Sequence, residues 1–359
     1  MTVRRYALVA GGGTGGHLVP ALTVARALVG ASGGQAVEIV GSRRGLEGDL
    51  LEGIGLPVTG LPGRGFTRSF GPRSVVDNVG AAAALVVAGV MALFVVARRR
   101  PSVVVAMGGY ACVPVALAAA ACGIPVVLVN LDAVPGAASR LVGRFARAAA
   151  VAFPGTPLAR SVVTGAPVRP EIVAAARPLA ADRVRARHRL ELPPDRFTVG
   201  IVGGSLGART INEAAMALAG LWSGRGDVAL YHVVGRRDAA WVRDRTGDLE
   251  ADGGLVYRQV PFEDHMAVFY QAADVVVSRA GAATVAELTV IGVPSVLVPL
   301  PGAPGDHQTR NAGALAAAGG AVTVADAECT GARLAAELDA LRMPAGRLGA
   351  MAEAAAGLG

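Results

Sequence analysis

The sequence predicts an α/β protein of two domains, each built on a doubly wound parallel sheet. The chain has 359 residues, which suits two domains of ordinary size. Short apolar runs ending near glycine alternate with alanine- and leucine-rich stretches, a pattern typical of buried parallel strands covered by helices on both faces. The same pattern starts again after a proline-containing segment at residues 164–170.

The individual elements follow from this alternation. In the first half we expect strands at residues 6–10, 37–40, 103–106 and 126–129. In the second half we expect them at 197–202, 229–233, 274–278 and 295–299. The sequence therefore predicts a first domain over residues 1–164 and a second over 165–341, with the alanine-rich tail 344–359 as a weak helix or a frayed end.

One segment stands apart from this pattern. Residues 79–97 carry no charge and are followed by three arginines, which by length and flank resembles a membrane span. Alanine and glycine supply nine of these nineteen residues, and both drive insertion weakly. A span here would also divide the strand–helix units on either side. We therefore expect a buried or membrane-surface helix, with Arg64, Arg68, Arg73 and Arg98 to Arg100 facing an anionic membrane surface.

Composition excludes several classes of protein. Hydrophobic residues make up 53% of the chain and charged residues 17%, which argues against intrinsic disorder. All 34 basic residues are arginine, so lysine Schiff-base chemistry and a Walker A loop are excluded. The net charge of +7 favours an acidic partner, but no basic stretch is interleaved with aromatics as in nucleic-acid binders, so we expect no nucleic acid.

The cysteines and the N-terminus bear on compartment and cofactors. Cys112, Cys122 and Cys329 form no CxxC pair, so neither a zinc cluster nor a disulfide framework is predicted. The apolar stretch before Gly11 is too short for a signal-peptide core. We expect a cytoplasmic protein that needs no metal and no cofactor.

The first glycine-rich turn, GGGTGGH at residues 11–17, follows an expected strand and opens a helix. Amides at such a helix start converge on an anion. The turn also contains GxGxxG, and the sequence Ser42-Arg43-Arg44 after the second strand would suit the 2′-phosphate of NADP. Phosphate binding and an NADP-dependent oxidoreductase both remain open on this turn.

The second turn, GGSLGAR at residues 203–209, opens the other half in the same way. Its amides and the Ser205 hydroxyl would hold a diphosphate without lysine or metal, and Arg169 would help to neutralise the leaving charge. Ser205 would also serve as an ordinary helix N-cap. Further on, Glu287 in SRAGAATVAEL would accept both hydroxyls of a ribose, or simply cap or solvate a helix.

A longer set of motifs runs in order from residue 11 to residue 312 and resembles the MurG family. They read GGGTGGHLVPALTVA, GGY, IPVV, VPGAASR, VAFPGT, VTGAPVR, GGSLGAR, SRAGAATVAEL, PSVLVPLPG and DHQTRNA. The resemblance implies a GT-B fold, in which two Rossmann-like doubly wound domains face a cleft and a final helix at about 342–359 packs back on the first domain. It also implies inverting transfer of N-acetylglucosamine from UDP-N-acetylglucosamine to a lipid-linked muramyl-pentapeptide in peptidoglycan synthesis, on the inner face of the cell membrane.

The resemblance also implies which residues meet each substrate. For the donor in the second domain they are Arg169 and Ser205 at the diphosphate, Glu287 at the ribose, the backbone near Phe262 and Glu263 at the uracil, and the Ala282 main chain, Gln308 and Asn311 at the sugar. For the acceptor in the first domain they are Thr14, Gly15, Gly16, His17 and Tyr110, and Asn130 is also expected at the acceptor.

Two departures from the family pattern bear on the chemistry. The family's His-Glu-Gln-Asn stands here as Val129-Asn130-Leu131-Asp132, so a candidate acid/base is now Asn130, which cannot accept a proton. His17, whose ordinary pKa of about 6.5 suits proton acceptance, is then the predicted base, with Asp132 as its competitor. Leu206 replaces a glutamine of the donor turn.

The departures leave alternatives beside the main reading. The chain would also fit a MurG-like enzyme that glycosylates another acceptor in secondary metabolism, or a nucleotide-sugar binding protein that turns over no donor. The NADP-dependent oxidoreductase is the remaining alternative.

Overall fold

The computed structural model describes residues 6–11, 15–34, 36–42, 55–63, 72–204, 206–246, 254–343 and 346–359, with side chains left undescribed at 15–17 and 72–77. The chain divides into two compact units, Met1–Arg169 and Pro170–Gly359. The division falls a few residues later than the sequence predicts, so Arg169 closes the first unit instead of lying in the second.

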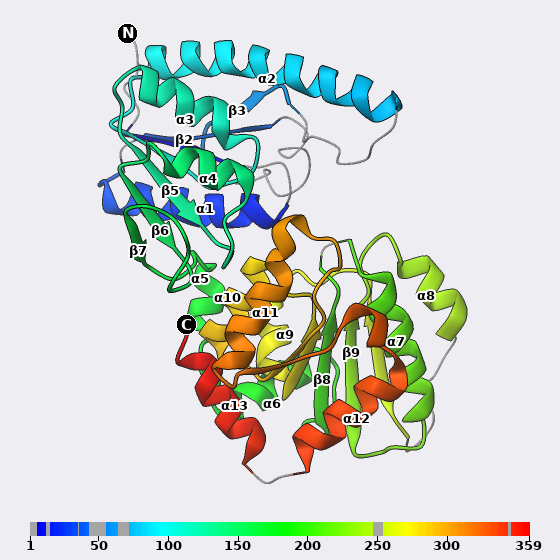
Figure 1. Cartoon of the computed structure of the whole chain (residues 1–359). Coiled ribbons are helices and arrows are strands. Elements are labelled where there is room, and N and C mark those ends of the chain that lie inside the picture. The colour runs from blue at the N-terminus through cyan, green and yellow to red at the C-terminus, as the bar shows by residue number, and fades with distance from the viewer. Residues whose placement is uncertain are drawn as a thin grey trace. The chain divides into compact units, whose positions relative to one another are not determined.

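The described residues of the first unit form one parallel sheet in the order β3-β2-β1-β4-β5-β6-β7. Its strands are β1 Ala7–Ala10, β2 Val37–Ser42, β3 Val58–Leu61, β4 Val103–Ala106, β5 Val126–Asn130, β6 Ala148–Val151 and β7 Ser161–Val163. Its helices are α1 Gly15–Ala31, α2 Pro72–Arg99, α3 Cys112–Ala121 and α4 Ala137–Gly143. In Figure 1, α1 lies on one face of this sheet and α3 on the other, and α2 runs across α3.

The second unit repeats this plan with strands in the order β10-β9-β8-β11-β12-β13, again all parallel. The strands are β8 Phe197–Val202, β9 Val228–Val233, β10 Val256–Val260, β11 Val275–Ser278, β12 Ser295–Leu297 and β13 Ala321–Thr323. The helices are α5 Pro170–Ala174, α6 Ala180–Arg189, α7 Arg209–Leu221, α8 Ala239–Thr246, α9 Met266–Ala272, α10 Ala282–Ile291, α11 His307–Ala317, α12 Gly331–Arg342 and α13 Arg347–Ala356. Two 3-10 turns, η2 Pro304–Asp306 and η3 Asp326–Glu328, lie in its loops.

Both sheets confirm the predicted fold class. The residues of β1 are completely buried, as expected of a continuous apolar strand with covered faces. In each unit the strand order reverses beside the first strand, between β1 and β4 and between β8 and β11. Ligands of doubly wound sheets bind at the carboxyl ends of the strands at such reversals. The fold therefore points to one candidate site in each unit.

The helix α2 combines the two environments considered for it. Ala81, Ala88, Ala92 and Val96 are buried in the core of the first unit, and α2 packs against α3. By length and composition, Asn78–Arg99 would be able to cross a membrane, and 22% of its apolar window is buried in the protein. The helix is thus only partly buried, and its buried side belongs to the core of the first unit.

The last helix is well formed. The segment α13 clusters with the second unit, where it packs on α10 and α12. The contact with α10 is close, since a Cβ on Gly292 at the end of α10 would lie 3.0 Å from the Ala356 Cβ. The implied packing of residues 342–359 on the first domain stays a prediction.

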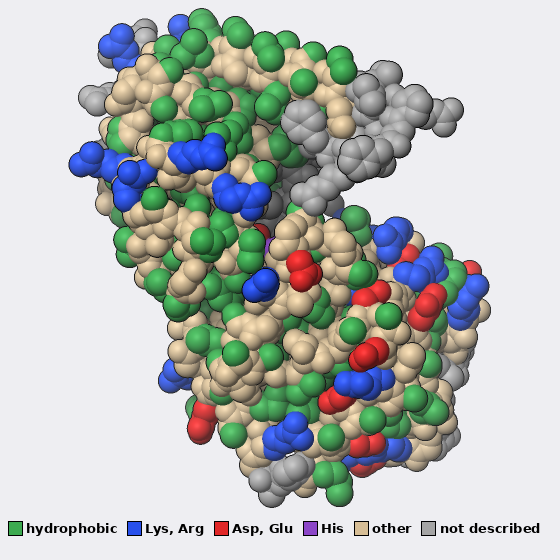
Figure 2. All heavy atoms as spheres, viewed as in Figure 1, with side chains coloured by type: hydrophobic (Ala, Val, Ile, Leu, Met, Phe, Trp, Pro, Cys, Tyr) green, Lys and Arg blue, Asp and Glu red, His purple; other side chains and the backbone are tan. Residues whose placement is uncertain are grey.

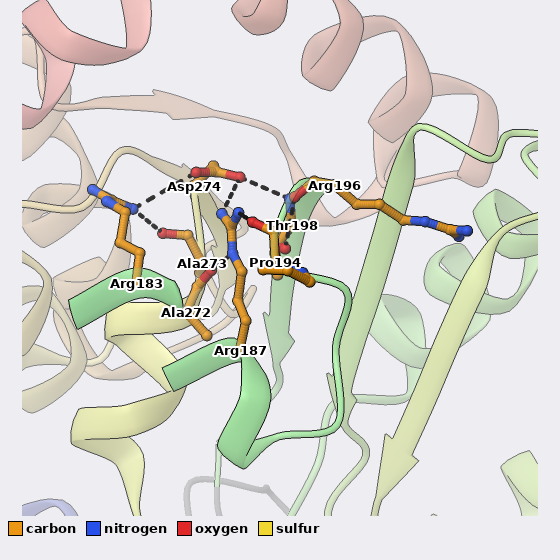
Figure 3. Close-up of polar contacts among 8 residues, drawn as sticks. All are labelled: Arg183, Arg187, Pro194, Arg196, Thr198, Ala272, Ala273 and Asp274. Carbon is orange, nitrogen blue, oxygen red and sulfur yellow. Dashed lines mark hydrogen bonds and ion pairs between the residues drawn. The ribbon is translucent and has the colours of Figure 1, made fainter. Parts of the chain in front are cut away.

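An ion pair between the buried Arg187 and the partly exposed Asp274 fastens α6 to the amino ends of β8 and β11 (Figure 3). Arg187, 7% exposed, donates through Nη2 to Asp274 Oδ2 at 2.7 Å, and the Thr198 amide donates to the same oxygen at 2.8 Å. Arg187 also donates to the carbonyls of Ala272 and Pro194. The Arg187 guanidinium thus donates to one carboxylate and two carbonyls, and such partners are the condition for retaining a charge in the interior.

We expect Asp274→Ala to destabilise the protein by about 3–5 kcal/mol, because it leaves the buried Arg187 guanidinium without its counter-charge. Chemical denaturation checks this value. Glu328→Ala is the matched control, since the Arg333–Glu328 pair is largely exposed, and we expect it to cost less than about 1 kcal/mol. Equal effects of the two substitutions would contradict a structural role for the Arg187–Asp274 pair.

Candidate functional site

The residues predicted for the acceptor lie after neighbouring strands of the first sheet. Gly15, Gly16 and His17 begin α1 after β1, Tyr110 follows β4, and Asn130 ends β5. Because β1, β4 and β5 are adjacent and parallel, these positions share the carboxyl edge of one sheet. Thr14 lies outside the described residues, as does the His17 side chain, so their roles stay predictions.

Tyr110 is tied to the end of β2. The Tyr110 hydroxyl donates to Ser42 Oγ at 3.1 Å, and the Ser42 hydroxyl donates to the Gly63 carbonyl at 3.1 Å. These bonds join the segments that follow β4, β2 and β3. The structure thus gives Tyr110 a role in shaping this edge, and contact with an acceptor remains a prediction.

Asn130 has a role that its sequence position does not reveal. It is 4% exposed, and its Nδ2 donates to the Asp132 carbonyl oxygen at 2.6 Å. An asparagine that bonds the backbone two residues later closes a tight local turn. Asn130 therefore shapes the loop after β5, and Asp132 is carried on that loop at intermediate burial.

In the second unit, two turns at the carboxyl edge press against each other. Gly207 has φ +82°, and a Cβ on it would lie 2.3 Å from the Val234 carbonyl oxygen. Gly235 has φ +92°, and a Cβ on it would lie 2.2 Å from the Gly207 amide nitrogen. Only glycine fits both positions. The turn that opens α7 is thereby held against the end of β9, while Ser205 within it lies outside the described residues and Leu206 is 66% exposed.

A buried hydrogen-bond chain supports this turn from behind. His232, completely buried on β9, lies 2.8 Å from the Tyr257 hydroxyl and 3.0 Å from Asn212 Oδ1. Asn212 Nδ2 in turn donates to the Val234 carbonyl and to Asp238 Oδ2, both at 3.1 Å. Burial lowers the pKa of His232 to about 3, so it is a neutral bridge at physiological pH.

Arginines surround the buried end of that chain. Asp238, 1% exposed, pairs with Arg237 at 3.0 Å and with Arg209 at 3.7 Å. The Arg237 guanidinium holds the pKa of the Asp238 carboxyl below its usual range. Sequence reasoning missed Asn212, His232 and Asp238; the available signal was a polar residue inside the otherwise apolar run of β9.

Glu287 lies in the interior beside a second helix. It is 9% exposed on α10, and the Tyr270 hydroxyl of α9 donates to its Oε2 at 2.9 Å. Ala282 is the first residue of the same helix, after Gly281 at its N-cap. A largely buried carboxylate, one to two turns into a helix that begins after the carboxyl end of β11, is suited to binding hydroxyl groups.

The loop after β10 is braced by a carboxylate. Glu263 Oε2 accepts the Tyr231 hydroxyl at 2.7 Å, and Glu263 Oε1 accepts the amide of His265 at 2.7 Å. The Arg236 guanidinium lies 4.3 Å from the ring centroid of Phe262. Burial, followed by the hydrogen bond to Glu263, raises the pKa of Tyr231 above its usual range, so it stays a donor.

Gln308 and Asn311 on α11 hold two loops of the same edge. Gln308 Oε1 accepts the Leu300 amide at 3.0 Å, and the fully buried Asn311 donates to the Ala280 carbonyl at 3.2 Å. Asn311 thereby fixes the turn just before Ala282. The bonds described are to backbone, and contact of either residue with a sugar stays a prediction.

Arg279 is a further residue that sequence reasoning passed over. Its Nη1 donates to the carbonyls of Val298 and Pro299 at 3.1 and 3.3 Å and pairs with Asp326 Oδ1 at 2.5 Å. It thus joins the ends of β11 and β12 to η3. Within the described ranges, no group of three or more His, Cys, Asp or Glu side chains could hold a metal ion.

Two family models match the chain, one to each unit. "Glycosyltransferase family 28 N-terminal domain" matches residues 7–151, and "Glycosyltransferase family 28 C-terminal domain" matches residues 198–358. The first match spans β1 to β6, and the second spans β8 to β13 apart from Phe197 at the start of β8.

Curated relatives and a solved structure match almost the whole chain. A protein of Moorella thermoacetica is 40% identical and one of Desulforudis audaxviator is 37% identical, each match covering 98% of this chain and 94% of the relative. Both are named UDP-N-acetylglucosamine--N-acetylmuramyl-(pentapeptide) pyrophosphoryl-undecaprenol N-acetylglucosamine transferase. The crystal structure of Acinetobacter baumannii MurG aligns with a TM-score of 0.75 at 29% identity, over 98% of this chain and 94% of that one.

Proposed function

The chain belongs to the MurG family within glycosyltransferase family 28, and from this we propose that it moves N-acetylglucosamine from UDP-N-acetylglucosamine to a lipid-linked muramyl-pentapeptide acceptor. Family membership makes it a UDP-sugar-dependent glycosyltransferase with the GT-B architecture. It also replaces the NADP-dependent oxidoreductase as an interpretation of the first glycine turn.

The interlocked glycine turns of the second unit carry the donor assignment. A diphosphate bound at the start of α7 would meet backbone amides and the positive end of the helix dipole. The contact between Gly207 and Gly235 fixes these amides before a ligand arrives, and such preorganised donors stabilise charge that develops on a leaving group. Arg169 and Ser205 are proposed to complete the diphosphate site.

The remaining donor contacts follow along the same edge. We assign Glu287 to the ribose, the backbone of Phe262 and Glu263 to the uracil, and Ala282, Gln308 and Asn311 to the sugar. The hydrogen bonds of Asn311 and Arg279 hold the loops of this edge in place, and a fixed edge helps to orient a bound donor.

The proposed reaction is a single displacement with inversion. The acceptor hydroxyl attacks the anomeric carbon, the bond from that carbon to the UDP oxygen breaks, and the hydroxyl proton passes to a base. Thr14, Gly15, Gly16 and Tyr110 are assigned to the acceptor. His17 is the proposed base and Asp132 its competitor, because Asn130 cannot take a proton and its amide is bound to the Asp132 carbonyl.

The presence of Asn130 in place of an acidic residue also supports a second candidate function, transfer from UDP-N-acetylglucosamine to a different acceptor. Release of UDP in the presence of a lipid I analogue, of other lipid-linked sugars and of small sugar acceptors distinguishes the two. We expect the lipid I analogue to stimulate UDP release most strongly. Stimulation by another acceptor alone would favour the second candidate, and UDP binding without any turnover would favour a binding protein.

We further propose that the protein lies peripherally on the inner face of the cell membrane through α2. The outward side of this helix exposes large apolar side chains (Figure 2), among them Val79, Val86, Val90 and Phe94 at 65–68% exposure. The opposite stripe, with Ala88 and Ala92, is part of the core. A spanning orientation would remove that stripe from the core, whereas surface adsorption keeps it.

The charges at the end of α2 suit an anionic surface. Arg98 and Arg100 are exposed there, while Arg99 Nε lies 3.1 Å from the buried carboxylate of Glu38. Arg99 therefore ties the helix end to β2, and its neighbours extend toward solvent. Arg64 and Arg68 lie outside the described residues, as does the side chain of Arg73.

We expect the double substitution Val90→Ser/Phe94→Ser to weaken binding to anionic vesicles by about tenfold or more, since each apolar side chain contributes up to roughly 1.5–3 kcal/mol when fully immersed. Vesicle sedimentation measures this. Val162→Ser/Val163→Ser, at similarly exposed positions on β7, is the control and should bind as the parent does. Binding should fall with salt. Release by detergent alone, never by salt or alkaline pH, would contradict peripheral binding.

A further inference from the structure

The carboxylate proposed to hold the ribose is itself held by a phenol. Tyr270 is 1% exposed on α9, and its hydroxyl donates to Glu287 Oε2 at 2.9 Å. The Tyr270 ring is fixed in turn by an edge contact with Phe269, whose ring centroid lies 5.3 Å away at 65°. A rigid donor therefore meets a carboxylate in the interior of the second unit.

The hydrogen bond from Tyr270 restricts the terminal torsion of the Glu287 side chain. The terminal torsion of glutamate is broad and roughly two-fold, so an unsupported carboxylate samples many planes. A hydrogen bond to an ionised group is stronger than one between neutral groups, and burial strengthens it further. The Tyr270 hydroxyl thus sets the plane of the Glu287 carboxylate. Because an ionised carboxylate has about four acceptor directions, one phenol donor leaves capacity for more.

We propose that Tyr270 is a positioning residue which makes the donor site selective for ribonucleotides through Glu287. Adjacent hydroxyls on a ribose present two donors in a fixed relation, and a carboxylate must have the correct plane to accept both. A single hydroxyl, as in a 2′-deoxyribose, can donate to the carboxylate in many orientations of the carboxylate plane. Orientation by Tyr270 therefore adds affinity for ribose and little for deoxyribose. The inference rests on the proposed donor site.

The test is calorimetry with UDP and with 2′-deoxy-UDP on the parent and on Tyr270→Phe. We expect the parent to prefer UDP by about tenfold, the value of one net hydrogen bond. In the phenylalanine variant this ratio should fall below about threefold, chiefly through weaker UDP binding. Tyr257→Phe is the matched control, because Tyr257 is another buried tyrosine of the unit and bonds to His232. It should keep the parent's ratio.

Equal weakening of UDP and 2′-deoxy-UDP by Tyr270→Phe would show a role in packing only and overturn the proposal. The double variant Tyr270→Phe/Glu287→Ala supplies a second criterion: on top of Glu287→Ala, which removes the acceptor, loss of the hydroxyl should change UDP affinity less than about twofold. A larger additional loss would mean that Tyr270 acts apart from Glu287. Unchanged UDP affinity in Glu287→Ala would instead refute the donor assignment itself, so the two failures are distinguishable.

Discussion

Replacing His17 by alanine should lower transfer by about 10²- to 10⁴-fold, the usual contribution of a general base. His17 stands at the start of α1, after the strand beside the reversal in the first sheet. An imidazole with an ordinary pKa of about 6.5 accepts a proton near neutral pH. UDP affinity should stay nearly intact, because the donor is assigned to the second unit.

Initial rates and calorimetry on the same preparation check both halves of this prediction. His188→Ala, at an exposed position on α6, is the control and should keep full activity. Asp132→Asn should be less damaging than His17→Ala. Parent-like turnover by His17→Ala would defeat the proposal, and so would a large loss of UDP affinity. Loss of the acidic limb of the pH–rate profile in the variant identifies His17 as a base, as opposed to a donor to the acceptor phosphate.

Replacing Glu287 by alanine should weaken UDP binding by about 2–4 kcal/mol, or roughly 30- to 1000-fold. Two hydroxyls that donate to one ionised carboxylate each contribute about 1.5–3 kcal/mol before the cost of desolvation. The substitution also leaves the Tyr270 hydroxyl without its acceptor in the interior. Binding is therefore measured beside thermal unfolding, so that loss of folded protein is not counted as loss of affinity.

Two variants sharpen the Glu287 experiment. Glu213→Ala, at an exposed position on α7 in the same unit, should leave UDP affinity unchanged. Arg169→Ala should weaken UDP more than uridine, because Arg169 is assigned to phosphate. Unchanged UDP affinity in Glu287→Ala would remove this residue from the ribose site.

The sequence predicted the fold where a single local pattern decides the structure. Apolar runs such as residues 6–10 and 197–202 became β1 and β8, and the glycine turns after them open α1 and α7. Five of the described strands were not predicted, because none of them is a fully buried apolar run: β3, β6, β7, β10 and β13. All of these except β6 lie at sheet edges, where fewer neighbours demand apolar side chains.

The candidate site was also predicted only in part. Its positions along the edge follow from motifs, but its internal bonds join residues that no spacing rule connects. In the sequence, Asn130 stands where the family pattern has an acidic residue. The structure shows that its side-chain amide closes a turn by donating to the Asp132 carbonyl. Tyr270 and Glu287 meet only because α9 and α10 pack together. The contact of α13 with Gly292 is likewise one that its sequence does not signal.

The proposed reaction transfers one N-acetylglucosamine, with inversion, from UDP to a lipid-linked acceptor. Its most direct test is the mass and anomeric configuration of the product formed from UDP-N-acetylglucosamine and a lipid I analogue. We expect an acceptor heavier by one N-acetylhexosamine residue, which is joined to it by a β-linkage, opposite to the α-linkage of the donor. An α-linked product, or an acceptor of unchanged mass beside a protein that binds UDP, would contradict it.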